Sequence, residues 1–394
     1  MRVLVYEPKF VGHFLGFAAA AARAFAELGI DVTLGLSSHA EDSAPAKIKL
    51  QGLPEKVEVR FGCDVPKLYK KWSNARLEAR GLESFLRAEP FDWLVVPSAD
   101  FLVPGLVLDR GVHRLVSRLG GVDLVLHNCR AAYPQVGLRE WPEVWFDRLA
   151  ATIASRHRLL TVDEYVTSGA APGRIGLVSN PVTRLPHFFD CRQPKIEQAE
   201  ARKRLGLATD AAWIGSAGDL GRRKGTELLI DGFAQSCGEG DTRLALFGLL
   251  SASAKAALEK HASLVEQGRI VTRDRYVTDE EFTDFFPAMD VVWTGYPRQV
   301  GMASTLLFAA DSNRPVIAVD YGGVGWTVRE YQLGVVCRPD GDSVASAIRS
   351  SLRDKASPAG AERFLTQHTT AAFNEVLTAG VRQRIGAMPE DGEP

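Results

Sequence analysis

Short apolar runs rich in Val, Ile and Leu alternate with amphipathic helical patterns along the whole chain. Such runs are typical of buried parallel strands, and the patterns between them are typical of crossover helices. A helix is expected at 15–28, because its apolar positions share one face and Gly29 follows them. In the first half we expect strands at residues 3–6, 31–36, 57–61, 93–97, 123–127, 159–162 and 175–178.

The alternation pauses near Asn180, in a stretch that carries Pro181, Pro186 and Pro194 and is typical of a linker. A second alternation follows, with strands expected at residues 213–216, 243–247, 269–272, 291–294, 316–319 and 335–337. The pattern predicts an α/β protein of two doubly wound, Rossmann-like domains, formed by residues 1–182 and 183–368. Such sheets bind ligands at the carboxyl ends of their strands, and two domains that face each other form a cleft there.

The composition of the chain disfavours several classes of protein. The 394 residues carry a formal net charge of -1, from 47 Lys and Arg against 48 Asp and Glu, so no global attraction to nucleic acid exists and any anion needs a local site. Five scattered cysteines without a CxxC pair disfavour a disulfide framework or a zinc site. The N-terminal residues lack the pattern of a signal peptide, and no apolar run approaches the length of a membrane span, so we expect a cytoplasmic protein.

A basic, glycine-rich turn at residues 215–225 follows an expected strand and opens a helix. Its Arg222, Arg223 and Lys224 lie beside the positive end of that helix, an arrangement that suits a diphosphate. The turn differs from the dinucleotide fingerprint, and also from the Walker pattern, because Gly225 stands where the latter has a hydroxyl residue. A solvated basic turn is the alternative.

A second turn, at residues 296–305, also follows an expected strand and leads into a helix. Backbone N–H groups from Gly301 onward, with the hydroxyls of Ser304 and Thr305, suit phosphate oxygens. The alternative is that one hydroxyl merely caps the helix, which is the commoner use of Ser and Thr at that position.

A third turn, at residues 320–325, ends the next expected strand. Its glycines, Gly322 and Gly323 among them, permit close approach of the backbone to a ligand. Three such loops at successive strand ends favour a binding site more strongly than any one of them.

The order of motifs in the second half resembles the donor domain of GT-B glycosyltransferases, particularly the large retaining family four, the glycosyl transferases group 1. The resemblance rests on Asn180-Pro-Val, Gly218, the run that starts at Lys224-Gly-Thr-Glu, and Arg314-Pro-Val-Ile-Ala-Val-Asp-Tyr-Gly-Gly. Residues 3–36 resemble the start of that family's acceptor domain, so the resemblance extends over nearly the whole chain.

The resemblance implies a nucleotide-diphosphate sugar as co-substrate and no further cofactor. It implies that Lys224 and a nearby Arg neutralise the diphosphate, while the loops at Gly301 and at Gly322 and Gly323 approach phosphate and sugar. Such cations stabilise the charge that develops on the departing nucleotide, as a metal does elsewhere. It also implies that the final helix, 369–385, packs back on the first domain.

Two departures from the family pattern concern the donor. The family has an Arg where this chain has Asp219, so Arg222 or Arg223 has to substitute for it. The family also has a pair of Glu residues, near the sugar and on the ribose, where this chain has Val300 and Phe308. Asp311 lies on nearly the same helix face as Phe308 and is a candidate for the ribose, with an ordinary surface helix Asp as the alternative.

Polar residues of the first domain also follow expected strands and are candidates for the acceptor side. The resemblance places His127 near the acceptor and the transferred sugar, where a histidine can accept a proton from a hydroxyl. His13 is a second candidate for catalysis, and a structural His bonded to backbone is the alternative for both. The other acceptor-side candidates are Gly12, Asp100 and Asn128.

Three further segments have a functional and an ordinary interpretation. Residues 274–277, with Tyr276, either line the nucleobase pocket through their backbone or form an ordinary loop. The acidic pair Asp340 and Asp342 superficially matches a metal chelate, but Asp342 is expected to cap the helix at 343–352, and we expect no metal. Residues 67–87 form a basic amphipathic helix, a candidate for peripheral contact with a membrane or else a solvated helix face.

The function that these observations predict is a metal-independent glycosyltransferase that moves a sugar from a nucleotide-diphosphate sugar to an acceptor hydroxyl. The acceptor class stays open between a glycan, a lipid-linked molecule and a small molecule, and nucleic acid is not expected as a partner. Two alternatives remain: a nucleotide-sugar epimerase on the same fold, and a catalytically degenerate protein that binds sugar nucleotides, which the missing Glu pair suggests.

Overall fold

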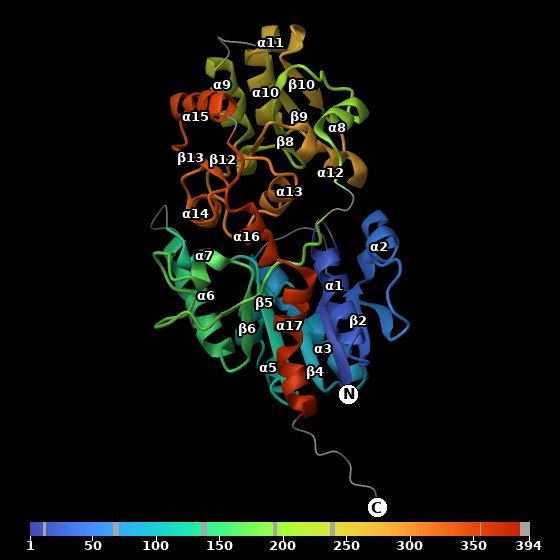
Figure 1. Ribbon diagram of the computed structural model, residues 1–394. Coiled ribbons are helices and arrows are strands. Elements are labelled where there is room, and N and C mark those ends of the chain that lie inside the picture. The colour runs from blue at the N-terminus through green and yellow to red at the C-terminus, as the bar shows by residue number, and fades with distance from the viewer. Residues whose placement is uncertain are drawn as a thin grey trace, which may run out of the picture. The chain divides into compact units, whose positions relative to one another are not determined.

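The computed structural model describes residues 1–10, 13–65, 71–134, 140–191, 195–236, 241–354 and 356–386. It divides into two compact units (Figure 1). Unit 1 comprises Met1–Phe188 and Thr369–Pro394, and unit 2 comprises Phe189–His368.

Unit 1 is built on a parallel sheet of seven strands in the order β3-β2-β1-β4-β5-β6-β7. The strands are β1 (Arg2–Glu7), β2 (Asp31–Ser37), β3 (Val57–Cys63), β4 (Trp93–Val96), β5 (Gly121–Leu126), β6 (Arg158–Thr161) and β7 (Thr183–Arg184). The helices are α1 (Phe14–Ala26), η1 (Ser38–Ala40), α2 (Ala44–Lys49), α3 (Lys71–Ala88), α4 (Leu102–Leu108), α5 (Arg110–Val116), η2 (Arg130–Ala132), α6 (Trp141–Ala154), α7 (Glu164–Thr167) and α17 (Thr370–Gly386).

Helices cover both faces of this sheet. The apolar residues of α1, α2 and α17 pack on one face, and α17 runs along the sheet beside α1 (Figure 1). On the other face, α3 packs against α4, which in turn packs against α6. Gly29, with a φ of 78°, follows α1 as expected, since a left-handed residue there favours glycine.

The predicted strand at residues 175–178 is wrong. This segment folds on itself, because Ile175 N–H donates to Asn180 Oδ1 at 2.7 Å and Gly176 N–H donates to Ser179 O at 2.9 Å. Ile175 is buried, but Leu177 and Val178 face solvent, and Val178 is 76% exposed. The seventh strand of the sheet is the two-residue β7, which follows this segment.

Unit 2 is built on a parallel sheet of six strands in the order β10-β9-β8-β11-β12-β13. The strands are β8 (Ala212–Ala217), β9 (Thr242–Phe247), β10 (Ile270–Arg273), β11 (Val291–Trp293), β12 (Val316–Val319) and β13 (Gly334–Cys337). The helices are α8 (Gln198–Arg204), η4 (Arg222–Lys224), α9 (Thr226–Ser236), α10 (Ala252–Lys260), α11 (Ala262–Glu266), α12 (Asp279–Ala288), α13 (Thr305–Asp311), α14 (Gly322–Glu330), α15 (Gly341–Asp354) and α16 (Ala361–Thr366).

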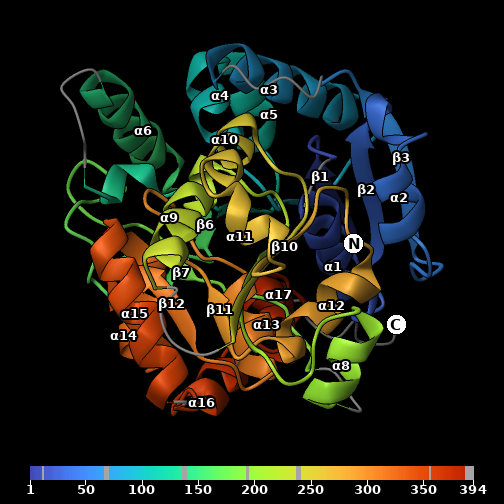
Figure 2. The same ribbon diagram turned by 90° about the horizontal axis from the view of Figure 1, so that it is seen from above.

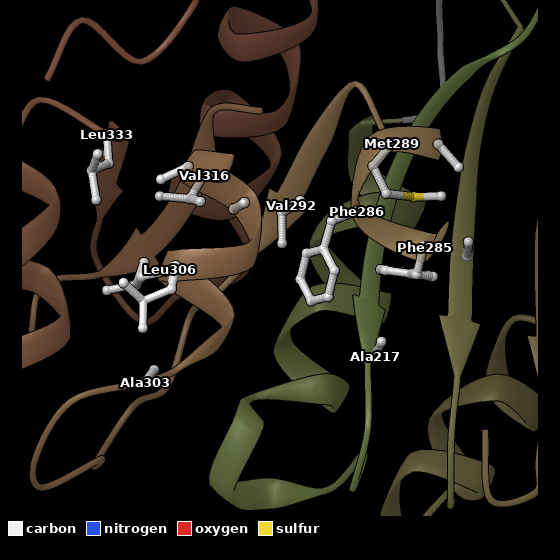
Figure 3. Close-up of a cluster of buried hydrophobic side chains, with 14 of the residues drawn as sticks. Ala217, Phe285, Phe286, Met289, Val292, Ala303, Leu306, Val316 and Leu333 are labelled. Carbon is white, nitrogen blue, oxygen red and sulfur yellow. The ribbon is translucent and has the colours of Figure 1, made fainter. Parts of the chain in front are cut away.

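Two apolar clusters hold the layers of unit 2 together. One joins α9 and α15 to one face of the sheet, and these two helices lie side by side (Figure 2). The other joins α8, α12, α13, α14 and α16 to the opposite face. Figure 3 shows part of this cluster, with Phe285 and Phe286 of α12 and Leu306 of α13 labelled.

Ala217 and Ala303 belong to this second cluster. Ala217 lies directly before the basic turn, and Ala303 lies within the second turn, between Gly301 and Ser304. The packing of the core therefore anchors both turns.

These observations confirm the predicted α/β class with two doubly wound sheets. One predicted cap is wrong. The carboxylate that accepts from the N–H of Ser343 at 2.8 Å is Asp340, while Asp342 already lies inside α15. Within the described ranges, no helix is both long and apolar enough to cross a membrane.

A buried carboxylate links the sheet of unit 1 to α17. Asp123 is fully buried and accepts from Trp93 Nε1 at 2.8 Å and from Arg158 Nη1 at 3.2 Å. Arg158 also donates to the carbonyls of Leu377, at 3.1 Å, and Val376. Burial raises the pKa of Asp123 from 3.8 to about 6, and Arg158 limits that rise.

We predict that Arg158→Met lowers the free energy of unfolding at pH 8 by about 3 kcal/mol, because it leaves a buried charge with one neutral partner. A raised pKa means that ionised Asp123 costs stability, and this cost appears as the pH rises through its folded value. The deficit of the variant should therefore be smaller at pH 5 than at pH 8 in urea unfolding. The exposed Arg110→Met is the control, and an equal deficit at both pH values would contradict the prediction.

Candidate functional site

The order of strands in unit 2 reverses between β8 and β11, which are neighbours in the sheet. The chain runs outward in one direction from β8 to β10 and in the other from β11 to β13. Loops on the two sides of such a reversal part from each other and leave a crevice at the carboxyl edge. The basic turn after β8 and the turn after β11 border this position, and the turn after β12 lies next to them.

Lys224 is the one of the three adjacent cations that turns inward. Its side chain is 6% exposed, and its ammonium donates to the carbonyl of Ala217 at the end of β8. Gly218, with a φ of 104°, lies so close that a Cβ there would be 2.9 Å from Lys224 Nζ. Glycine is therefore favoured here by the backbone conformation, and a Cβ would also crowd the Lys224 ammonium.

The basic turn packs directly on the turn after β11. Trp293 Nε1 donates to the carbonyl of Lys224 at 2.8 Å, and the Lys224 ammonium lies 5.9 Å from the ring centre of Tyr296. Arg223 Nη1 donates to Gln299 Oε1 at 3.2 Å. Arg222 and Arg223 are both exposed, so their side chains lie on the surface of the turn.

Tyr296 connects the buried ammonium to the start of α13. Its hydroxyl lies 3.0 Å from Thr305 Oγ1, and both side chains are buried. Ser304 is exposed, and its side chain makes no capping hydrogen bond to α13. The structure therefore contradicts the alternative in which the Ser304 hydroxyl caps α13. Gly301 has a φ of 82°, a conformation that favours glycine.

The turn after β12 leads into α14, which has nine residues. Gly322 is its first residue and has a φ of 53°, while Gly323 is buried. The preceding Tyr321 makes no side-chain cap. The first backbone N–H groups of α14 thus lie on the same sheet edge as the turns after β8 and β11.

The remaining candidates of unit 2 lie apart from this group of turns. Tyr276 is 78% exposed. Phe308 stacks on Phe286 at a ring distance of 5.1 Å and belongs to the apolar side of α13. Asp311 is the last residue of α13. The ammonium of Lys195 lies 3.8 Å from Asp311 Oδ1. Asp311 lines a separate cavity of about 330 Å³ together with Phe308.

The strand order of unit 1 also reverses, between β1 and β4. At this position Lys9, which is 3% exposed, donates to the carbonyl of Ser98 at 2.7 Å. Lys9 N–H donates to Glu7 Oε1 at 3.0 Å, and its ammonium lies 3.7 Å from Glu78 Oε1. Burial raises the pKa of Glu7 to about 8 and that of Glu78 to about 7. No sequence pattern indicated this group, although Lys9 stands two residues after a strand.

The polar residues expected on the acceptor side come together at the ends of β4 and β5. One oxygen of Asp100 accepts from the N–H groups of His127 at 3.1 Å and Asn128 at 2.7 Å. The rings of His13 and His127 lie 5.3 Å apart. Gly12, the remaining candidate, lies outside the described residues.

His127 has a defined tautomer, because its Nε2 lies 2.8 Å from the carbonyl of Pro97, which can only accept. The neutral ring therefore carries its proton on Nε2, and Nδ1 is the acceptor. Burial lowers the pKa of His127, while nearby Asp100 opposes this effect. The bond to backbone expected of a structural histidine is present, and it leaves the other nitrogen able to receive a proton.

The basic helix predicted at residues 67–87 corresponds to α3, which spans Lys71–Ala88. Residues 67–70 lie outside the described residues. Its apolar side packs on the sheet, while Arg76, Arg80 and Arg87 are exposed. This arrangement fits a solvated helix face, and contact with lipid stays a prediction. In the described part of the chain, no group of three or more His, Cys, Asp and Glu side chains has the arrangement of a metal site.

Comparison with curated proteins gives no match. Residues 211–354 match the family described as glycosyl transferases group 1. Among solved structures, sucrose-phosphate synthase from Thermosynechococcus elongatus is similar with a TM-score of 0.71 and 15% identity over 98% of this chain and 100% of that chain. HepE from Anabaena, in complex with UDP and glucose, gives a TM-score of 0.68 and 18% identity over 97% and 100% of the two chains.

A glycosyltransferase from Rickettsia africae gives a TM-score of 0.70 and 11% identity over 98% of this chain and 99% of that chain. At these identities the structures establish the fold, whereas the family match is made by the sequence of unit 2. The two findings agree with the resemblance drawn from the motifs after β8, β11 and β12. The chain therefore has the GT-B fold, and residues 211–354 of its second unit match the glycosyl transferases group 1 family.

Proposed function

We propose that this enzyme moves a sugar from a nucleotide-diphosphate sugar to an acceptor hydroxyl without a metal ion. The observation that carries the proposal is the buried Lys224 ammonium at the strand reversal of unit 2, joined through Tyr296 to Thr305. A buried cation is stable only beside groups that compensate its charge, and a diphosphate supplies that charge. The complexes of HepE with UDP and with UDP-glucose support a donor of this class.

The donor is held, in this proposal, by cations and backbone N–H groups from three turns. Lys224, with Arg222 or Arg223 at its border, offsets the charge that grows on the diphosphate as the bond to the sugar breaks. The N–H groups around Gly301, Ser304 and Thr305 and those at Gly322 and Gly323 receive phosphate oxygens. These positive groups offset the negative charge that a metal ion would otherwise offset, so the reaction as proposed needs no metal.

The acceptor side belongs to unit 1. His127 Nδ1 is the acceptor nitrogen of a neutral ring. Asp100 positions the backbone of His127 by accepting a hydrogen bond from its N–H. A ring in this state can take the proton of an acceptor hydroxyl as the new glycosidic bond forms. His13, whose ring adjoins that of His127, is assigned to contact with the sugar or the acceptor. The cytoplasmic location also stays a prediction.

A ligand panel and product analysis test the proposal. UDP-, GDP-, ADP- and dTDP-sugars are added singly, and one of them should raise the melting temperature, because a ligand that binds only the folded state stabilises it. That donor, mixed with candidate acceptors, should release the nucleoside diphosphate, and chelation of metals should leave the rate unchanged. An altered donor without release of nucleotide indicates the epimerase, and binding without any reaction indicates the degenerate protein.

We predict that Lys224→Met lowers turnover by about 100-fold, since it removes a positive group that acts on the leaving nucleotide. Met keeps the length of the side chain in its buried position, so circular dichroism should show a folded protein. The exposed Lys203→Met on α8 is the matched control and should keep the activity of the parent. Unchanged kinetics in Lys224→Met would refute the assignment.

We predict that His127→Gln lowers kcat by about 100-fold or more, within the range that general bases contribute, and leaves the thermal shift by the donor in place. The lowered pKa of His127 keeps the ring neutral, and thus able to accept a proton, below pH 6.5. The acid limb of the rate profile of the parent enzyme should therefore lie below that pH. A profile centred above pH 6.5, or a variant with full kcat, would assign a structural role to this histidine.

A further inference from the structure

Two tryptophans lie next to each other on the surface of α6. Trp141 is 50% exposed and Trp145 is 57% exposed. Residues four apart on a helix share a face, about 6 Å apart along the axis. Large apolar side chains grouped on a surface are a cost in water unless the patch serves contact with a ligand or partner.

The same face of α6 is covered further along the helix. Arg148 donates to the carbonyls of Ala131 at 2.9 Å and Arg174 at 3.0 Å, and Thr152 Oγ1 accepts from the N–H of Leu177 at 2.9 Å. The segment around Arg174 therefore packs on the second half of this face. The tryptophan pair is the part that this segment leaves exposed.

The tryptophan pair belongs to the connection that also carries His127. This connection leaves β5 at Leu126, and α6 runs from the carboxyl edge of the sheet back to the start of β6, so Trp141 and Trp145 are in its turns nearest the carboxyl edge. A salt bridge of 2.8 Å between Arg130 and Glu140 ties the two ends of the loop before α6. The exposed rings and the proposed acceptor base thus occupy one edge of unit 1.

The charges around the rings indicate what they bind. Residues 140–148 contain three acidic side chains and one basic one, and Arg130 pairs with one of the acids, so the rings are not surrounded by the excess of positive charge that an anionic lipid surface attracts. A sugar ring presents C–H groups on its faces, which pack on aromatic rings, and hydroxyls at its edge, which donate to carboxylates such as Glu143 and Asp147. Rings one helical turn apart suit successive sugars of a chain.

We infer that Trp141 and Trp145 form a platform that binds a neutral glycan chain, and that the acceptor of this enzyme is such a chain. The second part rests on the proposed transfer reaction and deepens it. The first part is a statement about binding alone. In this arrangement the platform holds sugars of the acceptor away from the reacting end, while His127 faces the hydroxyl that receives the new sugar.

Binding is tested on the full chain without any donor. A panel of neutral oligosaccharides of increasing length, with gluco-, manno-, galacto- and xylo- series, is titrated by calorimetry and tryptophan fluorescence. We expect affinity to rise with length and to fall by about tenfold or more in Trp141→Leu/Trp145→Leu, which keeps apolar side chains and removes the rings. Trp141→Phe/Trp145→Phe should bind within a few-fold of the parent.

Two controls make the outcomes distinct. Ile48→Ala, 58% exposed on α2 of the same unit, should bind as the parent does. Vesicles of phosphatidylcholine and phosphatidylglycerol are sedimented with each protein. Absence of oligosaccharide binding by the parent, equal binding by the Leu pair, or vesicle binding that depends on the rings in place of oligosaccharide binding would each overturn the inference.

Activity then separates this inference from the proposed reaction. With a working donor, the Leu pair should raise the KM for a long acceptor by about tenfold and leave the kcat for a monosaccharide acceptor unchanged, since binding lost away from the reacting atoms affects KM. Oligosaccharide binding without any transfer would leave the platform standing and refute the reaction. Transfer to long acceptors with the same KM in the Leu pair would refute the platform alone.

Discussion

The constraint on which this structure depends is the reversal of strand order in an all-parallel sheet. In each unit, consecutive strands pair outward from a central pair, β1 with β4 and β8 with β11. The loops after the two central strands must leave in opposite directions, so each sheet has one place where backbone groups are not covered by a crossover. Buried lysines stand at both places, Lys9 in unit 1 and Lys224 in unit 2. The strand order thus fixes the position in each sheet at which charged side chains and ligands can gather.

The two buried lysines are compensated differently, and this difference supports the proposed donor-binding role of Lys224. The Lys9 ammonium has the carboxylate of Glu78 at 3.7 Å within its own unit, and a cation with an internal partner of opposite charge needs no ligand. Lys224 donates to a carbonyl and faces an aromatic ring, and among the described residues no carboxylate forms an ion pair with it. An anion from outside is the natural complement of the second arrangement, which is why the donor is assigned to unit 2.

Sequence patterns predicted the strands well, because a buried parallel strand has to be apolar whatever it packs against. They failed at 175–178, where Leu177 and Val178 lie on the surface, and at Asp340, since a cap depends on the residue at which the helix begins. The three turns were found from glycines and cations next to strand ends. The contact of Tyr296 with Thr305, and the pairing of Lys9 with Glu78 on α3, depend on tertiary packing, and no local pattern records them.

The replacement of the family's second Glu by Phe308 has a physical consequence for the donor. Phe308 lies among Phe189, Phe282 and Phe286, with ring distances of 5.1 to 5.2 Å, and a carboxylate in their midst would be desolvated without a partner. This side of α13 has therefore become part of the apolar core, and Phe282 also approaches Gly218. In the proposed reaction, recognition of the nucleotide therefore rests on the cations and N–H groups of the three turns.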